Sequence, residues 1–324
     1  MSIAALLGAL VVGAAFGYGA QRGAFCMNSG FRDALEGDWT KVKALALAVA
    51  LQLLILPAIV AMGLAHPTRL PLQPLAGTVG GVLFGLSMRW AGTCAAGVWY
   101  KLGAGDLGSL LALLGMALGA TASDSGPLRA VRTSLQVPSA DPWSPAPAVS
   151  VLAGGVLLVA LARSPDSRAG AWTWRRTGIW IGFTAAMAWP LSAASGRAFG
   201  LAVVPGTTGA LSGIAGGAFP AWDVALVFGV LAGGWLAARR NGPVALRAPE
   251  PAVLMKRFVG GLGLGIGAVL AAGCTVGQGL TGLALLAPSS FLVMSAMFAG
   301  SAVATLAARR SEPGTPAAVA SAWF

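Results

Sequence analysis

The chain has 324 residues, of which 56% are hydrophobic and only 10% are charged, and its formal net charge is +11. Soluble domains carry about 25% charged residues, so the composition excludes a soluble globular protein. It predicts an all-α polytopic membrane protein in contact with membrane lipid. The basic residues fall between hydrophobic runs, where they set membrane topology, so no nucleic acid is expected as a partner.

Only three cysteines and one histidine, His66, are present, and no two cysteines lie close together in the sequence. An odd number of widely spaced cysteines argues against a disulfide framework. A zinc or redox-dithiol site needs clustered Cys and His ligands. We therefore expect no metal and no cofactor.

A membrane-spanning helix needs about 20 mostly apolar residues. This rule predicts nine spans, at residues 3–20, 42–64, 74–90, 104–122, 147–163, 176–194, 220–238, 257–272 and 287–308. No basic segment precedes the first run, so it is interpreted as a retained span and not as a signal peptide. The polar connection 123–146 is interpreted as an extramembrane loop within a single transmembrane domain, 1–324.

The basic residues alternate between the two sides of these spans. Seventeen Lys and Arg follow odd-numbered spans, and four follow even-numbered ones. By the positive-inside rule, the N-terminus is periplasmic and the C-terminus cytoplasmic. The expected location is the bacterial inner membrane.

Each cysteine lies in a short glycine-rich break in the hydrophobic pattern. Cys26 lies in 22–30, Cys94 in 90–97 and Cys274 in 272–279. Irregular backbone at membrane depth is tolerated only where protein or a water-filled cavity covers it. A half-helix that starts there directs unpaired N–H groups towards an anion. The breaks therefore predict a binding site or a transport path.

A neutral thiol can donate a weak hydrogen bond to an anion without repelling it, so the three cysteines are candidates for successive binding positions. The alternative is that each cysteine is simply a small buried hydrophobe. Candidate secondary contacts lie in the same breaks and in a fourth glycine-rich segment, 205–209: Asn28, Thr93, Thr275, Gln278, Gly206 and Thr207.

A shift of 180 residues aligns the chain with itself. Gly81, Gly85, Cys94 and Gly97 then fall on Gly261, Gly265, Cys274 and Gly277. The same shift places Cys26 opposite Gly206, so the fourth break lacks a thiol. The halves, about 1–122 and 176–308, are joined by a linker span at about 147–163. One joining span makes the second half inverted relative to the first, as in many transporters. Each half contributes two of four short, broken or re-entrant helices.

Two other groups of residues have simpler expected roles. Tryptophans including Trp99 and Trp222 fit an aromatic belt at the membrane interface. The acidic residues Asp33 and Asp106 are expected at the interfaces, with a proton relay as the alternative.

The segments Ala-Gly-Thr-Cys94 and Ala-Gly-Cys274-Thr-Val-Gly-Gln-Gly resemble the YeeE/YedE family of bacterial thiosulfate transporters. The resemblance covers nearly the whole chain. It implies nine spans and four short helices around a pseudo-two-fold axis, and inward transport of thiosulfate for cysteine synthesis. It also implies that Cys26, Cys94 and Cys274 pass the ion along by S–H···S hydrogen bonds.

The resemblance implies a partner as well, a TusA-like sulfur-carrier protein on a separate chain. Some members of the family are tied to selenium, so a selenium or other sulfur compound is an alternative substrate. Two further hypotheses belong to other classes: a membrane thiol enzyme that transfers sulfur, and a scaffold without cargo. A transporter without catalytic residues is the preferred interpretation.

Overall fold

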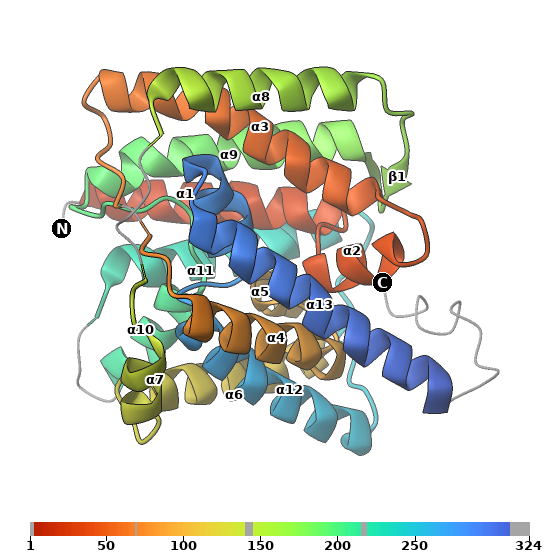
Figure 1. Ribbon diagram of the computed structural model, residues 1–324. Coiled ribbons are helices and arrows are strands. Elements are labelled where there is room, and N and C mark those ends of the chain that lie inside the picture. The colour runs from red at the N-terminus through yellow and green to blue at the C-terminus, as the bar shows by residue number, and fades with distance from the viewer. Residues whose placement is uncertain (1–2, 69, 140–144, 215–218, 312–324) are drawn as a thin grey trace.

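The computed structural model describes residues 3–68, 70–139, 145–214 and 219–311, and most of these residues are helical. Long helices run side by side between two faces of the molecule (Figure 1). The first begins at the left face of that view and the last ends at the right face. The backbone hydrogen bonds are therefore satisfied within helices, as a bilayer requires.

The long helices coincide with the hydrophobic runs of the sequence. They are α1 (Ile3–Arg22), α3 (Thr40–Ala61), α4 (Pro74–Ala91), α6 (Leu107–Asp124), α8 (Pro147–Ala162), α9 (Trp174–Ala193), α11 (Ala221–Arg239), α12 (Pro251–Leu270) and α13 (Pro288–Ser311). Between them lie the short elements α2 (Met27–Ala34), α5 (Ala95–Gly103), α7 (Arg129–Leu135), α10 (Val204–Ile214), η1 (Gly277–Gly282) and η2 (Leu283–Leu285).

Two-residue strands β1 (Arg168–Ala169) and β2 (Trp172–Thr173) form a small antiparallel turn before α9. The predicted extramembrane loop 123–146 contains the short helix α7, and its residues 140–144 lie outside the described part of the chain.

Six candidate membrane spans are long and apolar enough to cross a bilayer, and they contain α1, α3, α6, α11, α12 and α13. The fold is thus an all-α multi-pass membrane protein. Helices are also present at the other three predicted places, as α4, α8 and α9. Of these, α8 is apolar but has only 16 residues. That all nine helices span the membrane stays a prediction.

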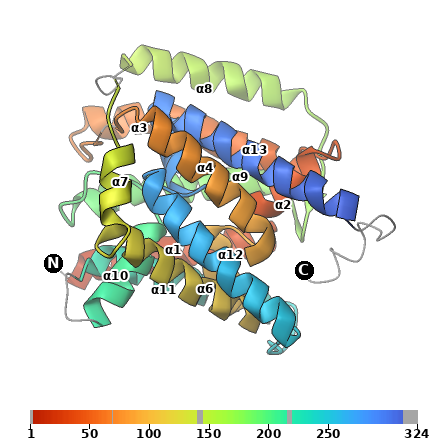
Figure 2. The same cartoon turned by 60° about the horizontal axis from the view of Figure 1, so that its bottom comes forward.

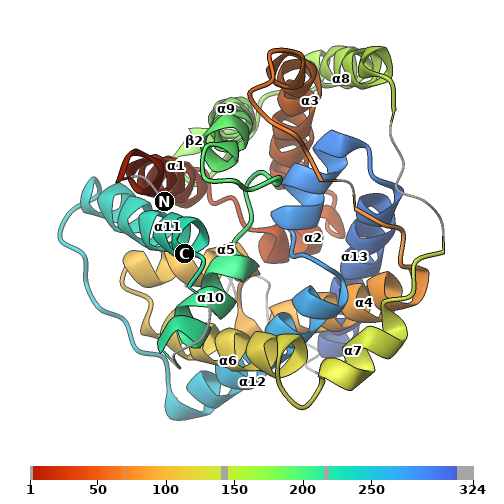
Figure 3. The same ribbon diagram turned by 90° about the vertical axis from the view of Figure 1, so that its left-hand side faces the viewer.

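Viewed from the left-hand face, the long helices surround the short helices α2, α5 and α10 (Figure 3). Helix α8 lies at the outer edge, where it packs against α3 (Figures 2 and 3). Most long helices therefore form a wall around these short helices, of which α2 and α5 directly follow Cys26 and Cys94.

The long helices pack closely against one another, chiefly α1 with α11, α6 with α12, α4 with both α12 and α13, and α3 with α9. Glycines make this close approach possible. A Cβ atom at Gly85 of α4 would lie 2.2 Å from the carbonyl oxygen of Met297, and one at Gly265 of α12 would lie 2.2 Å from that of Met116. Small residues spaced by four are typical of such membrane interfaces.

Candidate functional site

Each cysteine lies at the N-terminal end of a short helix. The carbonyl oxygens of Cys26, Cys94 and Cys274 accept the hydrogen bonds that begin these helices, from Gly30 at 2.8 Å, Val98 at 3.1 Å and Gln278 at 2.8 Å. The thiols therefore lie beside free N–H groups, at the positive end of the local helix dipole. All three cysteines are buried and unbridged.

The breaks arise in the same way before each cysteine. Two residues ahead of the thiol, Ala24, Gly92 and Ala272 have left-handed backbone, with φ of 46°, 71° and 51°. A left-handed residue is a common helix terminator, because it lets the next amide groups close the last turn. At the ends of α1 and α12 the following amide does this, donating to the carbonyl five residues earlier over 2.8 Å. Sequence position alone did not predict the two left-handed alanines.

Two of the three thiols meet. The sulfur atoms of Cys26 and Cys94 lie 3.7 Å apart, and the hydroxyl of Thr93 lies 3.8 Å from the Cys26 sulfur. Backbone amides surround the pair, since those of Ser29 and Cys94 face Cys26, and those of Gly97 and Met27 face Cys94. The starts of α2 and α5 therefore converge on one small polar cluster, the Cys26–Cys94 pair.

Cys274 forms a separate group. Its sulfur faces the backbone amides of Val203, Val276 and Gly277. The neighbouring Thr275 hydroxyl is buried and has no hydrogen-bond partner. A Cβ atom at Gly277 would meet no atom within 4 Å, so open space lies beside this buried backbone. Within the described residues, no hydrogen bond joins Cys274 to the other two thiols.

The helix after Cys274 differs from the other two. We expected an ordinary half-helix, but η1 is a π-helix of six residues and η2 a single 3₁₀ turn. Segments of π-helix occur often at functional sites. Helix η1 contains three glycines, of which two allow close packing against α13: a Cβ atom at Gly279 would lie 2.7 Å from the Met294 side chain, and one at Gly282 would lie 2.1 Å from the Ser290 hydroxyl.

The fourth short helix, α10, has no thiol. Val203 occupies the position of its N-cap, since its carbonyl accepts from the Thr207 amide at 3.2 Å. Gly206 lies inside the first turn, where a Cβ atom would be 2.2 Å from the carbonyl oxygen of Asp223. The predicted break is therefore present near Gly206, but the helix begins two residues before it, at Val204.

Of the remaining predicted secondary contacts, Gln278 has structural partners and Asn28 faces a cavity. Gln278 donates to the carbonyls of Ala271 and Ala272 at 2.8 and 3.1 Å and accepts from Ser290 at 2.6 Å, so it braces the turn before Cys274. Asn28 is half-buried and lines a cavity beside α12.

Two neighbouring side chains of α5 also belong to the site and were missed as site residues. Trp99 donates to the Thr207 hydroxyl over 3.0 Å and ties α5 to α10. It is 4% exposed, so its expected place in an interfacial belt is wrong. Tyr100 donates to the carbonyl of Phe25 over 3.3 Å, beside the Cys26 thiol. Their contacts are long-range, and no local pattern marks them.

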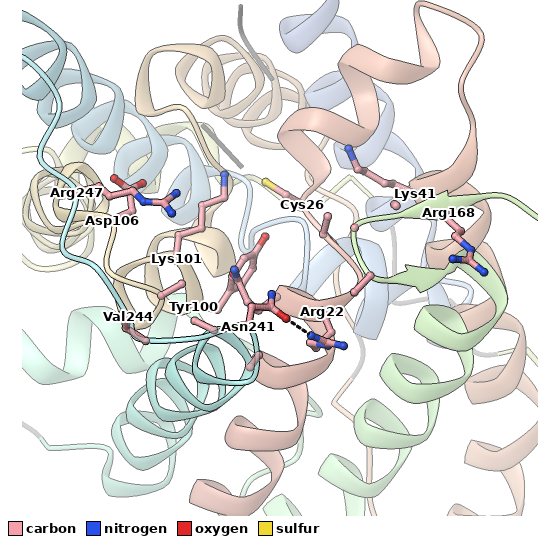
Figure 4. A pocket seen from close by; sticks show the side chains of 18 of the residues that line it. Arg22, Cys26, Lys41, Tyr100, Lys101, Asp106, Arg168, Asn241, Val244 and Arg247 are labelled. Carbon is pink, nitrogen blue, oxygen red and sulfur yellow. Dashed lines mark hydrogen bonds between the residues drawn. The ribbon is translucent and has the colours of Figure 1, made fainter. Parts of the chain in front are cut away.

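A cavity of about 760 Å³ leads from the face rich in Lys and Arg to Cys26, which with Tyr100 lines it. We call this cavity the vestibule; Figure 4 shows it from close by. Its charged lining is Arg22, Arg32, Lys41, Lys101, Arg168, Arg247 and Arg257, against Asp33, Glu36, Asp38 and Asp106. The lining is thus positive overall, as suits an anion.

Helices long enough to span a bilayer, interrupted at buried polar breaks beside a basic vestibule, define a multi-pass membrane transport protein. The family comparison agrees: residues 22–303 match the sulphur transport family. The chain belongs to this family, the same YeeE/YedE group that its cysteine segments resemble.

Two curated proteins are similar to the chain over most of its length. One is 32% identical over 309 residues, covering 87% of this chain and 93% of the relative, and is named "Thiosulfate transporter TsuA" from Spirochaeta thermophila. Another of the same name, from Escherichia coli, is 31% identical over 324 residues, covering 91% and 92%. These relatives are transporters, in keeping with the preferred interpretation of this chain as a transporter and not an enzyme.

Proposed function

We propose that the protein carries thiosulfate, or a related sulfur-containing anion, inward across the bacterial inner membrane along a path lined by Cys26, Cys94 and Cys274. The observation that carries the proposal is the Cys26–Cys94 pair, whose sulfur atoms lie 3.7 Å apart at the starts of two helices. The names of the two transporter relatives support thiosulfate as the substrate.

The path uses hydrogen bonds that are individually weak. A thiol donates weakly, so the anion can leave each position for the next. The Thr275 hydroxyl, buried and without a partner, supplies a further donor beside Cys274. The anion enters near Cys274, moves to the Cys26–Cys94 pair and leaves through the vestibule.

Within this proposal, the two halves 1–122 and 176–308 form an inverted repeat. Helix packing supports it: the contact of α1 with α11 has its counterpart in α9 with α3, and that of α4 with α13 in α12 with α6. The short helices follow the same rule, since α10 contacts α11 and α6 while α2 contacts α3 and α13.

Uptake of labelled thiosulfate into cells that lack other importers tests the proposal. Losing a hydrogen bond to a charged group costs about 1.5–3 kcal/mol, and the lower end applies to a weakly donating thiol, so Cys94→Ala and Cys274→Ala should each lower uptake about tenfold. The control is Met62→Ala, a change of an exposed residue at the end of α3. Unchanged uptake in both cysteine variants at equal protein levels would contradict the cysteine path.

Competition in the same assay shows which anion the transporter prefers. Unlabelled thiosulfate should suppress uptake of the label more strongly than sulfite or a selenium oxyanion does, if thiosulfate is the preferred cargo. Stronger suppression by the selenium compound would favour the alternative substrate. Delivery to a TusA-like sulfur carrier is part of the proposal, and a co-purification from cells fed thiosulfate tests it.

A further inference from the structure

The vestibule places a cation directly in front of the Cys26 thiol. In Figure 4 the Lys101 side chain extends across the cavity towards the Cys26 sulfur, and the Tyr100 hydroxyl lies below it. Lys101 is close enough to act electrostatically on that thiol, and it donates to the carbonyl of Gly92 over 3.3 Å. An anion that leaves Cys26 along the cavity therefore passes this ammonium group.

The acidic residues of the vestibule are largely neutralised by neighbouring cations. Asp33 pairs with Arg32 at 3.0 Å and Lys41 at 2.5 Å. Both oxygens of Asp106 accept from Arg257, at 2.7 and 2.6 Å. A paired carboxylate repels an anion much less than an isolated one, so the remaining positive charge decides the potential inside the cavity.

Arg22, at the end of α1, brings a second cation. Its Nη1 atom donates to the amide oxygen of Asn241 over 2.7 Å, a neutral partner. Its Nε atom is buried without a hydrogen-bond partner, which is costly for a charged group unless a ligand satisfies it. Guanidinium groups bind oxyanions through such adjacent N–H groups.

We propose that the vestibule is an anion-binding exit site, in which Lys101 beside Cys26 and Arg22 beside Asn241 bind a small divalent oxyanion in turn after it leaves Cys26 (Figure 4). This inference deepens the proposed function and rests on it for the direction of transport. Free thiosulfate and sulfate share the required chemistry, and both are used as probes below.

The test measures which reagents reach Cys26. Purified wild-type protein is treated with an anionic or a cationic methanethiosulfonate reagent, and mass spectrometry follows modification of Cys26. A single charge at a few ångströms in a partly screened cavity changes local ion concentration about tenfold, so the anionic reagent should react about tenfold faster. Thiosulfate and sulfate should slow it more than chloride does at equal ionic strength.

Matched variants assign the effect to the two residues. Lys101→Met and Arg22→Gln should each reduce the anionic preference severalfold, whereas Lys101→Arg should retain it. Arg168→Gln is the control, because Arg168 lines the same cavity but is exposed and points away from Cys26 (Figure 4).

Three results would overturn the exit site: equal reaction of the two reagents in wild type, a Lys101→Met protein that behaves like the Arg168→Gln control, or a Cys26 that neither reagent reaches. If Lys101→Met does not fold, Arg22→Gln decides the question. Thiosulfate uptake is measured in parallel. Anionic preference without uptake would refute the proposed function alone, and uptake without anionic preference would refute the exit site alone.

Discussion

Gly97 and Gly277 follow their cysteines by three residues, and their surroundings differ. A Cβ atom at Gly97 would lie 1.9 Å from the Thr93 hydroxyl and 3.5 Å from the Cys26 sulfur. A Cβ atom at Gly277 would meet nothing within 4 Å. The 180-residue shift aligns these two glycines, but Gly97 is packed tightly beside the Cys26–Cys94 pair, whereas Gly277 is packed loosely beside Cys274.

This difference gives a prediction for the two glycines. Gly97→Ala should lower stability by about 1–3 kcal/mol, because overpacking displaces Thr93 and the thiol pair. Gly277→Ala should keep the melting temperature of wild type but lower thiosulfate uptake, because the methyl group fills space next to Cys274. Thermal unfolding in detergent and cellular uptake provide the two measurements. A stable, fully active Gly97→Ala protein would contradict the described packing.

At the residue scale, the sequence indicated the three cysteines because each interrupts a hydrophobic run with glycines. It did not indicate which thiols meet, since Cys26 and Cys94 are brought together by helices far apart in the chain. For the same reason the sequence did not predict Tyr100 as a site residue. Lys101 counted only as a topology marker, because its relation to Cys26 depends on the fold.

At the element scale, the paired glycines of α4 and α12 act alike. A Cβ atom at Gly81 of α4 would lie 2.7 Å from the Cβ atom of Ala296, and one at Gly261 of α12 would lie 2.2 Å from the carbonyl oxygen of Ala112. Together with Gly85 and Gly265, they form two small-residue faces in which the glycines are spaced by four residues. The glycines that the 180-residue shift aligned therefore serve equivalent helix contacts.

These contacts predict that replacing a glycine destabilises the interface of α4 with α13 and that of α12 with α6 by similar amounts. Gly85→Ala and Gly265→Ala should each lower stability by about 1–3 kcal/mol, because backbone on the partner helix cannot move away cheaply. Gly155→Ala on α8 is the control, since a Cβ atom there meets nothing within 4 Å. The melting temperatures of the two variants and the control, measured side by side, test whether the two losses of stability are equal. A large loss in only one of the two variants would count against the repeat.

Helix positions followed from hydropathy, because a continuous apolar run can satisfy its backbone in a membrane only as a helix. The π-helical geometry of η1 did not follow, and neither did the start of α10 at Val204. Both depend on how neighbouring helices pack against these glycine-rich segments, because the segments themselves have no strong preference for one backbone conformation.

At the scale of the whole molecule, the basic residues predict which ends of the helices face the cytoplasm. With the N-terminus periplasmic, the exposed residue Ser125 after α6 lies outside and the exposed residue Asp166 after α8 lies inside. In intact cells, an impermeant maleimide should label Ser125→Cys at once and Asp166→Cys only after permeabilisation. Wild type, treated in the same way with and without permeabilisation, gives the background, which includes any labelling of Cys26 through the vestibule. The opposite labelling pattern would reverse the predicted orientation.

The pairing of α1 with α11 also has a consequence for how the protein is made. The partner of the first helix begins at Ala221, about 200 residues later in synthesis. At roughly 5–20 residues per second, α1 waits about 10–40 s before its partner emerges. Its glycine-lined face, with Gly13 and Gly17, must be sheltered during that interval by lipid or the insertion machinery. During synthesis, the face of α1 that packs against α11 therefore has to stay free of other contacts until the second half of the chain has been inserted.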